Sequence, residues 1–350
     1  MPRRDEGVVM QENWYVAGVD CGGTKDAGTV LRPDGKFLVD RMIESPSRVL
    51  EGPEAAITAL EEALDAALAE AGVRREQIRA VGLDTPGPAS ATGVISRKGA
   101  TNFSGPAWRG FDVRTALEER IGIPVAYMND ANAAALYAHN AHFGPASRLY
   151  SSISAIIGTG LGGGLVEAGR VIPGRSGMAG EIGHVQIPLD GVLEDGQPVP
   201  RCNCGLSGDG ESFASLTGIR QNLLPYWLTR YPDHPLHAID DEARRAYQVR
   251  TLAEEGDEMC RRIFEQQAKA LGALFRIASN FTDPTAYFVG GGVVETAPEF
   301  RSWFLARVKE NMNLREEQAE AAVIATVPDL DMAGGRGAAL AALASVLPPT

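Results

Sequence analysis

The sequence predicts a two-domain α/β protein, and three observations support this class. At 350 residues the chain exceeds the usual size of a single hydrophobic core. Segments typical of strands and segments typical of helices both occur along the chain. A strand, a glycine loop and a second strand occur twice, at 14–43 and 150–172. This weak internal similarity indicates two related domains.

Apolar runs and turn residues locate the elements of the first half. A Gly/Pro/Ser-rich stretch over 84–104 is expected to be a loop. Gly72 is the expected end of one helix, and Asp112 is the expected N-cap of the next. The expected strands are 14–20, 27–31, 36–43, 80–83 and 125–128, and the expected helices are 53–71, 113–120 and a third that ends near His142.

The second half begins with a glycine-dense turn at 158–164 between two strands, followed by a strand at 171–172. Residues 188–201 are an expected loop, and 217–250 an expected helix followed by an insertion without recognisable chemistry. The remaining predictions are helices at 252–281, 298–311 and 337–346, and strands at 286–289 and 322–327.

Composition excludes several function classes. The net charge of -12 argues against nucleic acid as the main partner, because phosphate contacts need a basic surface. No apolar run reaches the roughly 18 residues of a membrane span. The N-terminus has two arginines but no apolar segment of a signal peptide. We therefore expect a cytoplasmic protein without a membrane partner, and its four cysteines agree with that.

The glycine-dense turn contains a misleading pattern. Gly158-x-Gly160-x-x-Gly163 matches the dinucleotide-binding fingerprint, which requires a strand, a turn and then a helix. Here a second strand is expected after the turn, which argues against a dinucleotide fold. Glycines still let a backbone approach an anion closely, so the turn suits phosphate; a glycine hairpin without a ligand is the alternative.

Two acidic residues stand at the ends of predicted strands. Asp20 precedes Gly22-Gly23-Thr24-Lys25, and such a carboxylate can hold Mg²⁺ through water while the loop faces a phosphate. The alternative is a plain hairpin turn capped by Asp20. Asp130 follows the strand 125–128 and opens a helix, where it is either a cap or a general base.

Cys202 and Cys204 are too close in sequence for an ordinary disulfide. With His184 and either Asp209 or Glu211 they could make a tetrahedral metal site, although Cys-x-Cys alone is a weak signal.

Taken together, these separated motifs resemble the ROK family of sugar kinases and related repressors. The resemblance rests on the Asp20–Lys25 loop, the 129–134 segment and the long signature from Ile157 to His184. Asn102 with Trp108, the Cys202–Gly208 run, Gly290-Gly291 and the Gly337–Ala339 segment also fit. The match extends from about residue 14 to the C-terminus.

The resemblance implies an actin-like ATPase fold of ribonuclease-H-like topology with an interdomain cleft. It implies a small domain of 1–130 plus 334–350 and a large domain of 131–333. The implied reaction is ATP-dependent phosphorylation of a hexose, most often at the 6-hydroxyl, with Asp130 as the base. The implied sugar contacts are Asn102, Asn129, Asp130, Glu181, His184 and Glu211, and the implied nucleotide contacts are Asp20, Gly22, Gly23, Thr24, Lys25, Thr159, Gly160, Gly290, Gly291 and Gly292.

The implied cofactors are ATP, Mg²⁺ and a structural Zn²⁺, with one departure at the zinc loop. The family pattern has a third Cys where this chain has Asp209. Carboxylate is a harder ligand than thiolate, so His184, Cys202, Cys204 and Asp209 either hold zinc, hold it more weakly or leave the site empty. A homodimer is implied by the resemblance alone.

Glucose is the first substrate expected, with N-acetylglucosamine, N-acetylmannosamine, an amino-glucose and fructose as alternatives. A transcriptional repressor is disfavoured, because only about 13 residues precede the first strand, too few for a helix-turn-helix domain. A silent sugar sensor is disfavoured because Asp20, Asp130 and both glycine loops are kept.

Overall fold

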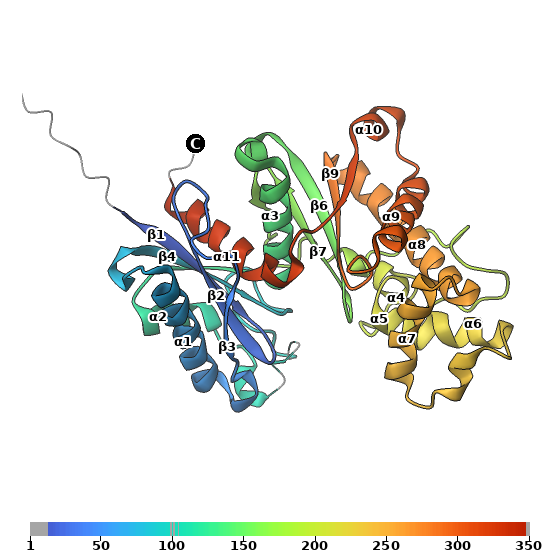
Figure 1. Cartoon of the computed structure of the whole chain (residues 1–350), viewed down its shortest axis with the longest axis horizontal. Helices are drawn as coiled ribbons and strands as arrows, with labels where there is room; N and C mark the ends of the chain where they lie inside the picture. Colours follow the sequence, from blue (N-terminus) through green and yellow to red (C-terminus); the bar gives the residue numbers. More distant parts are fainter. Residues whose placement is uncertain (1–12, 99, 101, 104, 348–350) are drawn as a thin grey trace, which may run out of the picture.

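Figure 1 shows a computed structural model of the protein, which describes residues 13–347 apart from residues 99, 101 and 104. The first of its two mixed sheets has the order β3-β2-β1-β4-β5. The strand β2 is antiparallel to both neighbours, whereas β4 runs parallel to β1 and to β5. Its strands are β1 (Tyr15–Cys21), β2 (Lys25–Leu31), β3 (Ile43–Pro46), β4 (Ile78–Thr85) and β5 (Val125–Asn129).

The second sheet repeats this topology with the order β10-β9-β6-β7-β8. Here β7 is antiparallel to both neighbours, and β9 runs parallel to β6 and to β10. Strand for strand this is the arrangement of the first sheet, so the internal similarity seen in the sequence corresponds to a structural repeat. The strands are β6 (Ser151–Ile157), β7 (Leu161–Glu167), β8 (Arg170–Val171), β9 (Ala286–Gly291) and β10 (Val323–Thr326).

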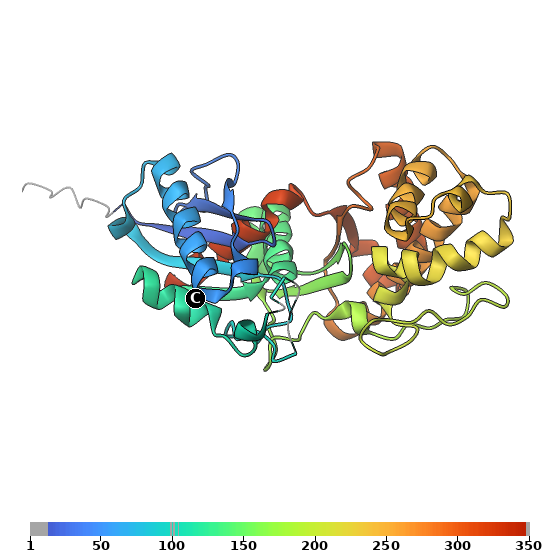
Figure 2. The same ribbon diagram turned by 90° about the horizontal axis from the view of Figure 1, so that it is seen from below.

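Helices cover both sheets (Figures 1 and 2). On the first sheet α1 and α2 share a core with Ala17 and Val19, while the C-terminal helix α11 returns to the opposite face. On the second sheet α3 packs against β6 and β7. The helices are α1 (Pro53–Ala71), α2 (Val113–Ile121), α3 (Asp130–Phe143), α4 (Gly210–Phe213), α5 (Leu216–Gly218), α6 (Leu224–Arg230), α7 (Glu242–Glu254), α8 (Glu258–Thr282), α9 (Pro298–Met312), α10 (Glu316–Ala321) and α11 (Leu330–Val346).

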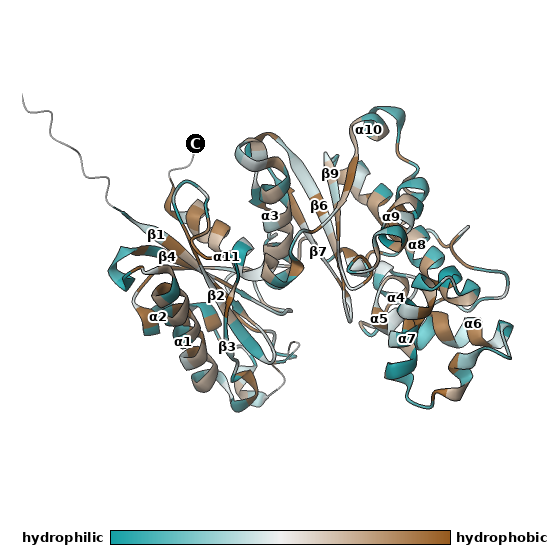
Figure 3. Ribbon diagram, viewed as in Figure 1, coloured by the Kyte–Doolittle hydropathy of each residue, from teal (hydrophilic) through white to brown (hydrophobic). Residues whose placement is uncertain are grey.

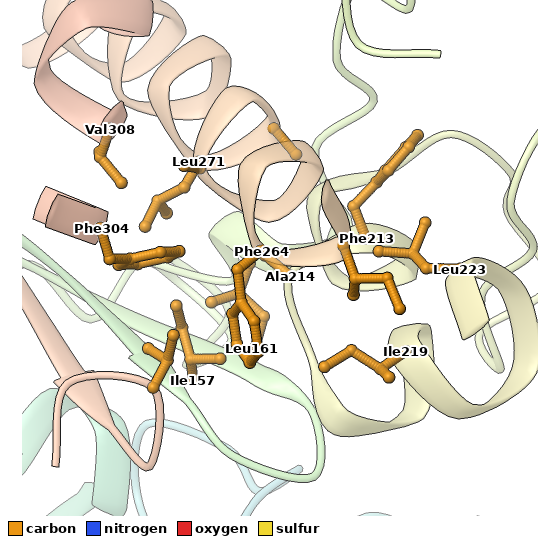
Figure 4. Close-up of a cluster of buried hydrophobic side chains, with 14 of the residues drawn as sticks. Ile157, Leu161, Phe213, Ala214, Ile219, Leu223, Phe264, Leu271, Phe304 and Val308 are labelled. Carbon is orange, nitrogen blue, oxygen red and sulfur yellow. The ribbon is translucent and has the colours of Figure 1, made fainter. Parts of the chain in front are cut away.

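The largest hydrophobic core joins β6 and β7 to the helices α8 and α9 (Figure 4). Ile157 and Leu161 contribute to it from the sheet, and Phe264, Leu271 and Phe304 from α8 and α9. All five are at most 5% exposed, so each side chain stabilises the fold by roughly 1.5–3 kcal/mol. Figure 3 shows the contrast with α7, whose outer surface is largely hydrophilic.

Local sequence explains several helix ends. Pro53 opens α1, and Gly72 ends it in the left-handed conformation with φ +65°. Asp112 caps α2 by accepting a 2.9 Å hydrogen bond from the Thr115 N–H, which confirms its predicted role. No helix in the described residues combines the length and the apolar character that crossing a membrane requires.

Two predicted elements differ from the structure: the strand over 36–43 and the start of the last helix. The expected strand over 36–43 is wrong: only Phe37 forms an isolated bridge, to Leu31, and the strand β3 starts at Ile43. The chain leaves the sheet because Val39 and Met42 are buried. The last helix starts at Leu330 rather than at Gly337, because its glycines fit close packing instead of ending the helix.

The helix predicted over 252–281 is confirmed over most of its length as α8, but its first residues belong to α7. Gly256 adopts φ +98°, which breaks the run into α7 and α8. Asp257 then caps α8 by accepting a 2.8 Å hydrogen bond from the Cys260 N–H. The region 217–250 is helical for much of its length, and α10 before the strand β10 was missed.

The predicted domain boundaries near 130 and 334 stay a prediction. The expected small domain includes residues 1–12 and 348–350, which lie outside the described residues.

Close contacts between α11, α3 and the first sheet depend on glycine. A methyl group built on Gly82 would lie 1.8 Å from the Ala338 carbonyl oxygen, and one on Gly18 would lie 2.0 Å from the Gly335 oxygen. One on Gly337 would lie 1.9 Å from the Ala133 oxygen of α3. These backbone contacts hold α11 directly against both β1 and α3, with no side chain between them.

Gly337→Ala is therefore expected to destabilise the protein by about 1–3 kcal/mol or more, because the new methyl group meets a backbone carbonyl that cannot move alone. Urea unfolding measures this free energy. Gly335→Ala is the matched control, since its methyl group would meet the flexible end of the Met42 side chain. Equal losses in the two variants would contradict the argument.

Candidate active site

Three aspartates gather where parallel strands of the first sheet end. Asp20 is near the end of β1 and lies in register with Asp84, near the end of β4. Asp130 begins α3 immediately after β5. The carboxyl ends of neighbouring parallel strands meet at one edge of a sheet, which is where α/β proteins place their chemistry. Asp84 was not predicted, although its position directly after the expected strand 80–83 was a usable signal.

Desolvation by surrounding protein atoms changes the acidity of all three groups, although Asp84 alone is fully buried, Asp20 is partly buried and the Asp130 side chain is exposed. The same desolvation acts on each of the pKa values that follow. It raises the pKa of Asp130 to about 6, and the charges of Asp20 and Glu181 add to the rise. It also raises the pKa of Asp20 to about 6. The pKa of Asp84 is raised well above its ordinary value, first by burial and then by the charge of Asp20. A carboxyl group with a pKa near 6 suits a general base at neutral pH.

The residue that caps α3 is Asn129 rather than Asp130. The Asn129 Oδ1 atom accepts a 2.9 Å hydrogen bond from the Asn132 N–H and so caps α3. Asp130 itself accepts only the adjacent Ala131 N–H, at 2.7 Å. Its second carboxylate oxygen therefore stays available for a ligand, whereas the Asn129 side chain is already engaged.

The glycine turn is shorter than predicted. Gly158–Gly160 form the turn, closed by a 2.9 Å hydrogen bond from the Gly158 N–H to the Gly160 oxygen. Residues 162–164 belong to β7, where the absence of side chains admits α3: a methyl group on Gly164 would lie 2.5 Å from Ala135 Cβ. The strand that follows confirms that this is not a dinucleotide-binding turn.

A cavity of about 300 Å³ opens beside this turn. Gly158, Thr159 and Gly292 line it, which brings together two loops predicted to bind nucleotide. Mostly apolar side chains from several elements form the rest of its wall, namely Ile157, Leu216, Ile219, Ala246, Tyr247, Arg250, Phe264, Gln267 and Val293. The Arg250 guanidinium donates to the Gly292 carbonyl at 2.8 Å and fixes that loop. Gly290 and Gly291 lie within β9 instead and do not line the cavity.

The loop after β1 lies against Asn102, a residue predicted to contact the sugar. A methyl group on Gly23 would lie 2.5 Å from Asn102 Nδ2, and Asn102 adopts φ +67°. Thr24 beside them is exposed. Lys25 is also exposed and forms an ion pair with Glu44 rather than with an acidic residue of the cleft. Trp108 is a core residue, since it is 2% exposed and its Nε1 donates to the Val49 oxygen at 3.0 Å.

The His184, Cys202, Cys204 and Asp209 side chains form one cluster, with ligand atoms all within 4.8 Å of one another. Asp209 Oδ2 lies 3.5 Å from His184 Nδ1 and 3.6 Å from Cys204 Sγ. Asp209 Oδ1 accepts a hydrogen bond from the Ser212 N–H, which fixes the carboxylate. Two thiols, an imidazole and a carboxylate suit tetrahedral zinc, so the donor set fits the metal.

Glu211 connects this cluster to the glycine turn. Its Oε2 atom accepts a 2.9 Å hydrogen bond from the Leu161 N–H, and the Cys202 thiol donates to its Oε1 atom at 3.3 Å. Burial raises the pKa of Cys202 and of nearby Glu181. The charge of Glu181 acts on Asp130, and the charges of His184 and Glu211 act on Glu181, so these four predicted sugar contacts lie near one another; the binding roles of all the predicted residues stay a prediction.

With the geometry described, similarity to known proteins can be assessed. A family model described as ROK family matches residues 16–345. The chain belongs to the ROK family. It is 31% identical over 318 residues to a glucokinase of Halalkalibacterium halodurans, covering 87% of this chain and 91% of that one. It is 32% identical over 280 residues to an N-acetyl-D-glucosamine kinase of Citrobacter koseri, covering 79% and 83%.

Solved structures of the family agree with the fold. The ROK hexokinase of Thermus thermophilus matches with a TM-score of 0.72 and 32% identity, over 95% of this chain and 99% of that one. The Streptomyces griseus ROK family glucokinase, solved with glucose and AMPPNP, matches with a TM-score of 0.62 and 28% identity, over 93% and 98%. These matches confirm the predicted actin-like ATPase fold.

A further aspartate, fully buried, lies on the other face of the first sheet. Asp26 pairs with Cys21, is 0% exposed, and neither of its carboxylate oxygens accepts a hydrogen bond. Burial raises its pKa to about 7 from an ordinary value of 3.8. Its contribution to stability is therefore full below pH 3.8 and is lost as the pH rises through about 7.

Asp26→Asn is expected to raise the free energy of unfolding at pH 8 by about 2 kcal/mol, because the amide carries no charge to bury. No gain is expected at pH 4, where Asp26 is protonated. Urea unfolding at both pH values measures the difference, with exposed Asp40→Asn as the control. A gain of equal size at both pH values would contradict the pKa argument.

Proposed function

We propose that this protein transfers the γ-phosphoryl group of ATP to the 6-hydroxyl of a hexose, with glucose as the first candidate. The observation that carries the proposal is Asp130, a solvent-exposed carboxylate at a strand end with one oxygen free and a pKa of about 6. The sugar kinase class rests on the family and on the glucokinases and the hexokinase it resembles.

In this mechanism Asp130 accepts the proton of the attacking hydroxyl. Such a base contributes roughly 10²–10⁴-fold to the rate. Most of the remaining catalysis comes from positioning and from neutralising phosphate charge. The hydrogen bond from the Ala131 N–H fixes one oxygen of the Asp130 carboxylate, which reduces the reorganisation that the reaction needs.

The nucleotide is assigned to the cavity beside Thr159 and Gly292. Its apolar wall suits adenine, and the N–H groups of Thr159 and Gly160, which follow the engaged Gly158 N–H, suit phosphate. Gly22, Gly23 and Thr24 would face the phosphates from the other half of the chain. Asp20 fits Mg²⁺, which takes carboxylate oxygens together with substrate phosphates and would supply positive charge there.

The sugar is assigned to the polar side chains that face Asp130. Asn102, Glu181 and His184 have hydrogen-bonding atoms for its hydroxyl groups, and each buried contact disfavours a sugar that lacks the matching hydroxyl. Asn129 and Glu211 also bind backbone N–H groups, so their part in sugar binding would use their remaining hydrogen-bonding capacity.

The similar proteins suggest two candidate sugars, glucose and N-acetylglucosamine. One similar protein is a glucokinase and another an N-acetyl-D-glucosamine kinase. A coupled ADP-release assay with Mg-ATP across glucose, N-acetylglucosamine, N-acetylmannosamine, mannose, fructose and glucosamine decides between them. We expect saturable turnover on one sugar; background ATPase with all of them, together with tight sugar binding, would favour a sensor.

Asp130→Asn is expected to lower kcat by about 100-fold or more while the protein stays folded, because the amide cannot accept the hydroxyl proton. In the wild type, kcat/KM should fall as the pH drops below about 6, where Asp130 becomes protonated. Steady-state kinetics from pH 5 to 8 measure both effects, with circular dichroism as the folding control. A variant with near-normal kcat would contradict the assignment of Asp130 as base.

We also propose that the His184, Cys202, Cys204 and Asp209 cluster binds zinc. Protein purified without a histidine tag should carry close to one equivalent by elemental analysis, and less than about a tenth of an equivalent would contradict the assignment. Asp209→Cys should bind zinc more tightly, since thiolate is the softer ligand. A homodimer, proposed by resemblance, is tested by light scattering.

A further inference from the structure

Asp84 is a buried carboxylate to which the proposed reaction assigns no role. It is 0% exposed, and neither of its carboxylate oxygens has a hydrogen-bond partner. Leaving a charged group in such a position costs several kcal/mol unless an opposite charge lies beside it. None of the ion pairs found in the described residues includes Asp84 or Asp20, and the cation whose charge lowers the pKa of Asp20 is the exposed Lys25, which is paired with Glu44.

The position of Asp84 relates it directly to Asp20. The two residues are partners in register on the adjacent parallel strands β1 and β4, so their side chains project from the same face of the sheet. A methyl group built on Gly334 would lie 2.8 Å from Asp84 Oδ2 and 3.4 Å from Asp20 Oδ2. Both carboxylates therefore point at the same spot under α11, with Asp20 the more exposed of the two.

We propose that Asp84 supplies a second carboxylate to the divalent-cation site that includes Asp20. The proposal rests on the proposed kinase function, in which the cation arrives with the nucleotide. Mg²⁺ is commonly held by one or two carboxylates and substrate phosphates, and it keeps several waters. Asp20 faces the cleft, and Asp84 lies behind it as the second negative charge. A cation bound there would offset the negative charge of two carboxylates that lie at one spot.

Asp26 provides a matched control in the same sheet. It is equally buried, and its two carboxylate oxygens also lack hydrogen-bond partners. Its partner across the strands is Cys21, next to Asp20 in a strand, so its side chain projects from the opposite face. Asp26→Asn thus removes a comparable buried carboxylate on the opposite face of the sheet, where it acts on Asp20 through charge alone and cannot ligate the cation.

The test measures binding of Mn²⁺, as a probe for Mg²⁺, by electron paramagnetic resonance, with the full-length protein in the presence and absence of ADP. We expect Asp84→Asn to weaken Mn²⁺ binding by roughly tenfold or more and Asp26→Asn to change it by less than about twofold. Wild-type affinity in Asp84→Asn, or an equal loss in Asp26→Asn, would overturn the proposal. Asp84→Ser serves as a second variant if the amide fails to fold.

Thermal unfolding provides a readout that is independent of turnover. Mn²⁺ should raise the Tm of the wild type and of Asp26→Asn but not that of Asp84→Asn, because a ligand stabilises only the state that binds it. A Tm of Asp84→Asn that rises as much as that of the wild type would contradict the proposal. If the wild type binds Mn²⁺ through Asp84 yet phosphorylates no sugar, the cation site stands and the proposed function fails.

Discussion

The structure depends on the absence of side chains where α11 meets its neighbours. Gly18 and Gly82 let backbone carbonyls of the helix lie directly against β1 and β4, and Gly337 lets the same helix touch α3. The edge of the first sheet and the start of α3 are therefore held at close range. This packing places the carboxylates of Asp20 and Asp84 near Asp130, because Asp130 begins the helix that α11 contacts.

Much of this arrangement was predictable from local sequence. Alternating apolar runs located β1, β4, β5 and β9, and the cap residues located α1 and α2, because those signals act over a few residues. The duplication of the strand–loop–strand pattern indicated two related units before any tertiary contact was known. Asp130 and the Cys202 to Asp209 cluster were likewise named as candidates from their positions, whereas the role of Thr159 was predicted only from the family resemblance.

What failed depends on contacts that are distant in sequence. The chain over 36–43 looks extended, but Met42 is drawn onto α11, some 290 residues later, so no strand forms. The last helix was predicted to start at Gly337, yet Gly334 and Gly335 also lie within α11, where close neighbours need their lack of side chains. Asp84 stood in an apparent loop, and only the register with β1 shows that it is the partner of Asp20.

The return of α11 has a consequence for how the protein is made. The first sheet is translated almost entirely before residue 130, but the helix that covers one of its faces lies at 330–346. Until the ribosome has released those last residues, that face of β1 and β4 has no partner. One face of the first sheet therefore stays uncovered while the second sheet is synthesised. The helix α11 then covers that face and also packs against α3.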